Sequence, residues 1–197
     1  ITNDPVANEI YRLDDFKKSR KAIKNAAARG MYRVPIDPFG RTGGLLTMPA
    51  VMMATANGVD TQPVLRGVWM LENILGSPPP APPKAVPALT PDTTGATTPK
   101  ERLAAHMADE SCAACHREID PLGFVMENFD AVGRWRDHYP VFKDVSGKTK
   151  RVNGHPVDAS GTLPNGVELG DVTDLKTWLA DDPEPLARCI GEKLMIY

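Results

Sequence analysis

Hydrophobic residues recur at helical spacing along much of the chain and predict a mainly α-helical fold. A long first helix is expected over residues 5–30, because Asp4 and Pro5 form a typical helix start and apolar residues follow every three or four positions. A second helix is expected from Pro63 to Gly76. Its predicted buried face consists of Val64, Val68, Leu71 and Leu75. Residues 31–60, rich in Pro and Gly, are expected to form loops.

Start and turn signals also divide the C-terminal half of the chain. Thr98 and Glu101 match a capping box, which predicts a helix that leads directly into residues 112–116. Between residues 140 and 170, three turn pairs predict one or two β-hairpins: Ser146-Gly147, Asn153-Gly154 and Asn165-Gly166. Two helices are expected to follow, one capped by Asp171 or Thr173 and the other from about Glu184. Their predicted buried side chains are Leu175, Trp178, Leu179, Leu186, Cys189, Ile190 and Leu194.

A proline-rich stretch separates the two parts of the chain. Residues 77–99 hold eight prolines in 23 positions, so this segment is expected to be an extended strap. The predicted organisation is an N-terminal helical region over 1–76, the strap, and a C-terminal region over 100–197. Together they are expected to form one structural domain.

Charge and hydropathy exclude some classes of protein. The 197 residues include 23 Lys and Arg and 25 Asp and Glu, a net charge of -2. We therefore do not expect a nucleic-acid binder or a protein held on anionic lipid by charge. The sequence contains no apolar run of about 18 residues, so no membrane span is expected. A start at Ile1 without Met indicates a processed chain or a piece of a longer one.

Candidate chemistry is concentrated in the segment Cys112-Ala113-Ala114-Cys115-His116. This CxxCH spacing is the attachment pattern of c-type haem. Two thiols one helical turn apart can both reach the edge of the haem ring, and the imidazole that follows can bind the iron. We therefore expect one covalent haem c on Cys112 and Cys115, with His116 as an iron ligand.

Two other uses of the cysteines are possible. A zinc site would need two further ligands from the remaining candidates, and none of them repeats a paired spacing. These candidates are His106, His138, His155 and Cys189. A thioredoxin-like dithiol would follow a strand, whereas a helix is expected before this motif. Cys189, on the apolar face of the last predicted helix, is expected to be a buried free thiol.

A histidine that binds haem iron also needs an acceptor for its other ring nitrogen. A backbone carbonyl near Asp120 or Pro121, downstream of His116, is a candidate for this acceptor. The segment 120–123, Asp-Pro-Leu-Gly, is also typical of a turn that ends a helix.

The second axial ligand is the least defined part of the predicted site. Met48 is the first candidate, because it lies between loop breakers and far from His116 in the sequence. His106 and Met126 are the alternatives, followed by Met52 and Met53, and an iron with no second protein ligand remains open.

Arginines are candidates to pair with the haem propionates, namely Arg66, Arg134 and Arg136. Trp135 and Trp69 are expected to line the haem pocket or the core.

Several segments, in this order, resemble the paired, functionally uncharacterised C-terminal domains of large secreted planctomycete cytochromes. The segments are Gly43–Met48, Pro63–Gly67, Leu75–Pro80, Cys112–Gly123, Glu127–Asp130, Gly133–Arg136 and Asp158–Gly161. The resemblance covers about residues 40–197. It implies a cytochrome c-like module with one haem, exported to the periplasm or secreted, and cut from a longer multidomain chain.

The expected function is electron transfer, with a redox partner protein or a neighbouring domain as the partner. An enzyme is not the first expectation, because such a carrier needs no substrate pocket. The alternative is a haem enzyme or a sensor of gas or peroxide with an open distal position. A third class is a structural module in which the haem only stabilises the fold.

Overall fold

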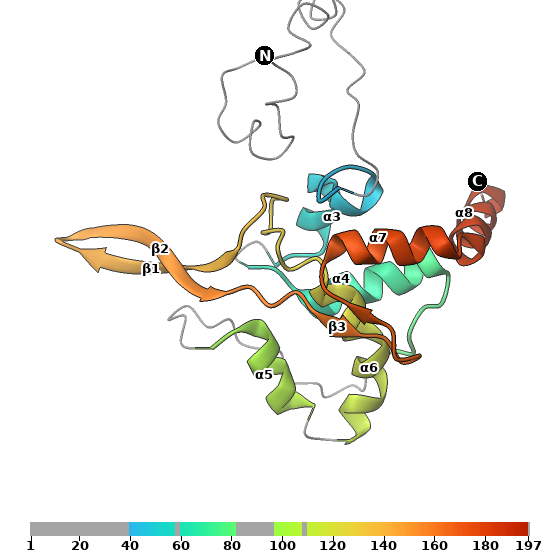
Figure 1. Cartoon of the computed structure of the whole chain (residues 1–197), viewed down its shortest axis with the longest axis horizontal. Coiled ribbons are helices and arrows are strands. Elements are labelled where there is room, and N and C mark those ends of the chain that lie inside the picture. The colour runs from blue at the N-terminus through green and yellow to red at the C-terminus, as the bar shows by residue number, and fades with distance from the viewer. Residues whose placement is uncertain (1–39, 58–59, 82–96, 108–109, 197) are drawn as a thin grey trace, which may run out of the picture.

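The computed structural model describes residues 40–57, 60–81, 97–107 and 110–196, in which helices combine with two small antiparallel sheets (Figure 1). Residues 1–39 and 82–96, with the expected first helix and most of the strap, lie outside this part. The elements are η2 (Leu45–Thr47), α3 (Pro49–Ala54), α4 (Pro63–Met70), η3 (Leu71–Leu75), α5 (Pro99–His106), α6 (Glu110–Phe124), β1 (His138–Val145), β2 (Lys148–Pro156), β3 (Gly161–Thr162), β4 (Glu168–Leu169), α7 (Val172–Asp181) and α8 (Glu184–Ile196).

The helix predicted after Pro63 is present as α4, continued by the wider π-helical turn η3. Gly76 ends it in the left-handed conformation with φ of 65°, which glycine adopts without strain. Leu71 of the predicted face is buried, and the other three residues of that face pack partly buried against the core. The structure also buries Arg66, Gly67 and Met70 of α4. The prediction missed Arg66 and Gly67 because their burial depends on tertiary contacts. A buried arginine needs a partner, and a glycine is buried here by close contact with another backbone.

The segment before α4 is more helical than predicted. Residues 45–54 form η2 and α3, although loops were expected over 31–60. Pro49, taken as a breaker, stands at the first position of α3, where its missing N–H costs no hydrogen bond.

The capping box at the start of α5 is confirmed. Glu101 N donates to Thr98 Oγ1 over 3.2 Å, and Thr98 N donates to Glu101 Oε2 over 2.7 Å. These hydrogen bonds lower the pKa of Glu101. However, α5 ends at His106, and the CxxCH segment lies on a separate helix, α6. The helix α6 continues through Pro121 to Phe124, so residues 120–123 are helical and the predicted turn there is wrong.

Two of the three turn pairs make hairpins. The strands β1 and β2 pair in antiparallel register with Val141 opposite Val152, and the turn between them is Ser146-Gly147. The β3–β4 pair turns near Asn165-Gly166. Asn153-Gly154 lies inside β2 instead, opposite Pro140, where the register shifts. The long β1–β2 hairpin extends away from the helices (Figure 1). Phe142, in the middle of β1, is 63% exposed.

The two predicted C-terminal helices are present. Asp171 caps α7 by accepting a hydrogen bond from Thr173 N over 2.7 Å. Cys189 is buried on α8 against Gly76, as predicted for a free thiol. The predicted burial of Ile190 and Leu194 is wrong, because α8 packs on η3 through its first turns and these side chains are 45% and 71% exposed.

One hydrophobic core joins α3, α4, η3, α6, β4 and α7. Its buried residues are Leu46, Val51, Met52, Met70, Leu71, Ile74, Ile119, Leu122, Val125, Met126, Phe129, Leu163, Leu169, Val172, Leu175 and Leu179. None of the helices in the described part of the chain has both the length and the apolar character needed to cross a membrane.

Candidate functional site

The CxxCH segment occupies the first turns of α6. Cys112 and Cys115 are both half-buried free thiols, and Cys115 packs against the hydrophobic core. Residues three apart on a helix lie on the same face, about 5–6 Å apart at Cβ. The two thiols therefore come from one side of one rigid element, as the sequence spacing predicts.

The side chain of His116 contacts a carboxylate that lies one helical turn later on α6. His116 Nδ1 lies 2.9 Å from Asp120 Oδ1, and the two side chains are 14% and 8% exposed. In the tautomer with the proton on Nδ1, this nitrogen donates to the carboxylate and Nε2 is the nitrogen that a metal would bind. The predicted acceptor for His116 was a backbone carbonyl near Asp120. The structure places the Asp120 side chain there instead.

The helix α6 is fixed on two sides just after His116. A Cβ on Gly67 of α4 would overlap the carbonyl oxygen of Ile119, and a Cβ on Gly123 would overlap the carbonyl oxygen of Pro63. On the other side, a Cβ on Gly161 of β3 would lie 2.8 Å from Pro121 Cα. These close approaches hold the segment that carries Asp120, and with it the turn that carries His116.

Lys100 connects α5 to the segment before β3. Its Nζ donates to Asp158 Oδ2 over 2.7 Å and to Ser160 O over 2.9 Å, and it lies 5.8 Å from the centre of the Phe124 ring. Burial would raise the pKa of Asp158, but the hydrogen bonds from Lys100 and Ser160 outweigh it and lower this pKa. The start of α5 is thus linked both to this segment and to the end of α6.

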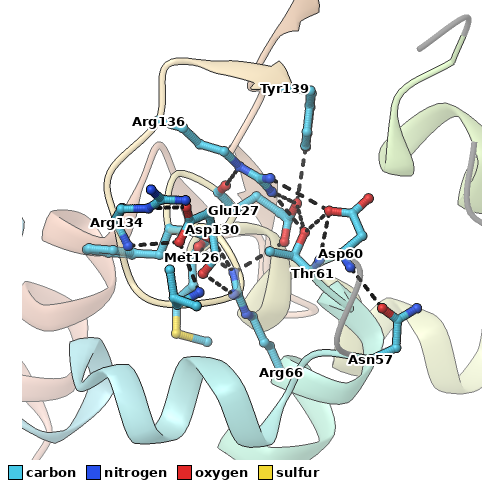
Figure 2. A network of polar contacts seen from close by, with 12 residues as sticks. Asn57, Asp60, Thr61, Arg66, Met126, Glu127, Asp130, Arg134, Arg136 and Tyr139 are labelled. Carbon is cyan, nitrogen blue, oxygen red and sulfur yellow. Dashed lines mark hydrogen bonds and ion pairs between the residues drawn. The ribbon is translucent and has the colours of Figure 1, made fainter. Parts of the chain in front are cut away.

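A buried polar network follows α6 and fixes the chain that leaves it (Figure 2). Arg66 on α4 is fully buried, and its Nη1 donates to Met126 O over 2.8 Å and to Phe129 O over 2.9 Å. Nη1 also lies 3.3 Å from Glu127 Oε1, in an ion pair whose side chains are both 0% exposed. Burial lowers the pKa of Arg66, and attraction to Glu127 opposes that shift.

Glu127 is the centre of this network (Figure 2). Its Oε2 accepts hydrogen bonds from Arg136 Nη2 over 3.0 Å and from Thr61 Oγ1 over 2.9 Å. Tyr139 OH also donates to Oε2, over 3.3 Å. Burial and the charge of Glu127 raise the pKa of Tyr139 well above its ordinary value. Sequence reasoning named Arg136 but missed Glu127 and Tyr139, although the segment Glu127–Asp130 was among those carrying the family resemblance.

Each arginine predicted to pair with a propionate has a carboxylate partner within the protein. Arg66 and Arg136 contact Glu127, and Arg134 Nε donates to Asp130 Oδ2 over 2.8 Å. Burial would raise the pKa of Asp130, but hydrogen bonds from the backbone and side chain of Arg134 and from Val132 N lower it overall. The propionate role therefore stays a prediction for all three, and the structure supports another role, that of holding residues 126–136 on α4.

The predicted tryptophans lie at the edge of the core. Trp135 packs edge-on against Phe129 with ring centres 5.3 Å apart, and the Arg41 guanidinium lies 4.3 Å from the Trp135 ring centre. Trp135 and Trp69 are both partly buried against the hydrophobic core. Of the two predicted locations, haem pocket or core, the structure shows both tryptophans packed against the core.

The methionines predicted as second axial ligands lie at the start of α3, within α3 and just after α6. Met48 is 47% exposed and caps α3, which lies beyond the C-terminal end of α6 and away from its first turns (Figure 1). Met53 on α3 is exposed as well. Met126 and Met52 are fully buried in the core. The side chain of His106 lies outside the described residues.

The described residues do not support the two other uses of the cysteines. In this part of the chain, no group of three or more His, Cys, Asp or Glu side chains is arranged to hold a metal ion. The described strands form two antiparallel pairs, so no parallel strand of a thioredoxin-like unit precedes α6 within the described ranges. The donor set of Cys112, Cys115 and His116, with its acceptor Asp120, instead fits the covalent attachment of haem.

Comparison with known proteins gives one match, which spans this site. Residues 42–139 match the PSCyt3 family. PSCyt3 is described as a protein of unknown function (DUF1588), and it is a domain family associated with planctomycete cytochromes. No curated protein and no solved structure matches the chain.

The PSCyt3 match begins just before η2 and ends at the start of β1. It includes the α4–α6 contact, the CxxCH segment, the His116–Asp120 pair and the network around Glu127. The site and the α4 residues that position it thus fall within the PSCyt3 match, whereas Gly161 lies beyond its end. Of the expected pair of domains, the comparison shows a match to one family.

Proposed function

We propose that this chain binds one haem c covalently and transfers electrons through it. The observation that carries the proposal is the placement of Cys112, Cys115 and His116 on the first turns of α6, with His116 Nδ1 held by Asp120. The association of PSCyt3 with cytochromes supports it independently of this geometry.

Three residues of α6 would bind the haem. Cys112 and Cys115 would form the two thioether bonds, and His116 Nε2 would bind the iron. Haem, when bound, supplies an iron that gains and loses one electron without a change in the protein's covalent structure. The protein orients His116 through Asp120, and it holds α6 by its contacts with Gly67 and Gly161.

Electron transfer is favoured over catalysis because it requires only a fixed iron and a ring edge near the surface. Cys112 and Cys115 are half-buried and Ala114 between them is exposed, so one side of this turn faces solvent. An edge attached there would be accessible to a partner protein or a neighbouring domain. The resemblance to secreted cytochromes supports the further proposal that the chain acts in the periplasm or outside the cell.

A haem protein with an open distal position is the second candidate, and a specific observation favours it. Met48 caps a helix beyond the far end of α6, and Met126 and Met52 are buried in the core. An iron bound only by His116 would take exogenous ligands such as carbon monoxide, as sensors and peroxidases do.

Absorption spectroscopy tests the proposal and separates the two candidates. The chain, produced with a c-type haem attachment system, is expected to show reversible oxidised and reduced haem c spectra. An electron carrier with Met48 as ligand resists carbon monoxide and shows the sulfur-to-iron charge-transfer band, which Met48→Ala abolishes. Rapid carbon monoxide binding that Met48→Ala leaves unchanged would instead support the open site. A protein without any haem spectrum would contradict both.

A further inference from the structure

The structure gives His116 an anionic partner. The distance from His116 Nδ1 to Asp120 Oδ1 is 2.9 Å, and Asp120 is among the buried polar residues at 6% exposure. A backbone carbonyl, the acceptor expected from the sequence, carries only a partial charge. An ionised carboxylate carries a full charge, and burial weakens the screening of that charge by solvent.

The position of this carboxylate is fixed by its neighbours. Ile119 is in close contact with Gly67 of α4, and Pro121 is in close contact with Gly161 of β3. The backbone on both sides of Asp120 is therefore held by other elements. Since His116 and Asp120 lie four residues apart on the same helix, their contact does not depend on a mobile loop.

We propose that Asp120 is a positioning residue that makes His116 a stronger electron donor and lowers the reduction potential of the bound iron. This inference rests on the proposed function. A proton shared with a carboxylate raises the basicity of a ligating imidazole, and a more basic ligand favours the ferric ion. The negative charge of Asp120 favours the ferric ion as well, because that state carries one more positive charge.

Potentiometric titration of Asp120→Asn tests the inference. The amide has nearly the same shape but no charge, so the potential is expected to rise. We expect an increase on the order of tenfold in the ferrous-to-ferric ratio at a fixed applied potential, which is about 59 mV for a one-electron couple. Asp120→Glu keeps the charge and is expected to retain most of the low potential.

Glu118→Gln is the matched control. It removes the same charge from an exposed position two residues from His116 on the same helix. Its potential is expected to stay close to that of the unmodified protein, since an exposed charge is screened by water. Equal potentials in Asp120→Asn and Glu118→Gln would overturn the inference, because the contact would then have no electronic effect.

A measurement on the unmodified haem protein covers the case in which Asp120→Asn does not fold. The ¹⁵N chemical shift of His116 Nδ1 reports the charge of its acceptor. It is measured in a diamagnetic reduced state, which an iron with an open distal position reaches when carbon monoxide is bound. A shift typical of a carboxylate partner supports the inference, and a shift typical of a neutral carbonyl partner overturns it. Absence of haem from the unmodified protein overturns the proposed function and this inference together, whereas haem with an insensitive potential overturns the inference alone.

Discussion

Glu127 is fully buried between Arg66 and Arg136, so protein groups rather than water compensate its charge. The same carboxylate accepts hydrogen bonds from Thr61 and Tyr139. Removing one partner from a buried ion pair is costly because the opposite charge remains buried. Here the loss of Glu127 would leave two guanidinium groups without their carboxylate.

Glu127→Gln is therefore expected to destabilise the protein by about 3 kcal/mol or more in the free energy of unfolding. The measurement is urea denaturation followed by circular dichroism. Glu118→Gln, an exposed substitution of the same kind, is expected to stay within about 0.5 kcal/mol of the unmodified protein. A Glu127→Gln protein as stable as Glu118→Gln would show that the network does not hold residues 126–136.

Residues whose placement depends on short sequence spacing were predictable. The cysteines and His116 follow from one five-residue pattern, and the structure places them on one helix face. Arg66 was not predictable in the same way, because its acceptors Met126 and Phe129 lie about sixty positions away in the sequence. Asp120 is an intermediate case. Its position was expected, but the spacing could not decide between its side chain and a backbone carbonyl.

At the scale of elements, the contact between α4 and α6 determines how the CxxCH segment is presented. Gly67 and Gly123 bring the two backbones so close that a side chain at either position would overlap a carbonyl oxygen. Substitution there must separate the helices or distort one of them. Either change would displace α6 relative to the core.

Gly67→Ala is expected to cost about 1–3 kcal/mol, the usual range for overpacking, and to lower the fraction of chains that take up haem. Gly191→Ala on α8 is the matched control, since a Cβ there has no heavy atom within 4 Å. In a helix interior this control is expected to be neutral or to stabilise by up to about 1 kcal/mol. Unfolding curves and haem content of the two variants give the comparison. If both variants behave alike, the close helix contact is not needed.

Elements with local start and stop signals were predicted correctly. Thr98 and Asp171 act as caps, and Ser146-Gly147 forms the turn of a hairpin. The errors arose where tertiary contacts determine the end of a helix or the burial of a side chain. The segment 120–123 was taken as a turn that ends a helix, yet α6 continues through it to Phe124. The apolar face of α8 was expected to be buried, yet its last turns extend beyond the core.

At the scale of the whole molecule, the first turns, the middle and the end of α6 have different roles. Its first turns carry the candidate haem ligands, its middle is fixed by α4 and β3, and its end leads into the network around Glu127 (Figures 1 and 2). The core includes residues from Leu46 to Leu179, so both sides of the proline-rich segment contribute to it. The sequence predicted helices with small hairpins, but not which of them pack together, since packing partners are set by contacts far apart in the chain.

The most direct test of the central claim is the intact mass of the purified, denatured and reduced protein after production with a c-type haem attachment system. The account predicts a mass increase of one haem that survives denaturation. This increase should be lost in the double variant Cys112→Ala/Cys115→Ala and kept in Cys189→Ala, which removes the cysteine outside the motif. A protein without added mass, or a haem that remains in the double variant, would contradict the account.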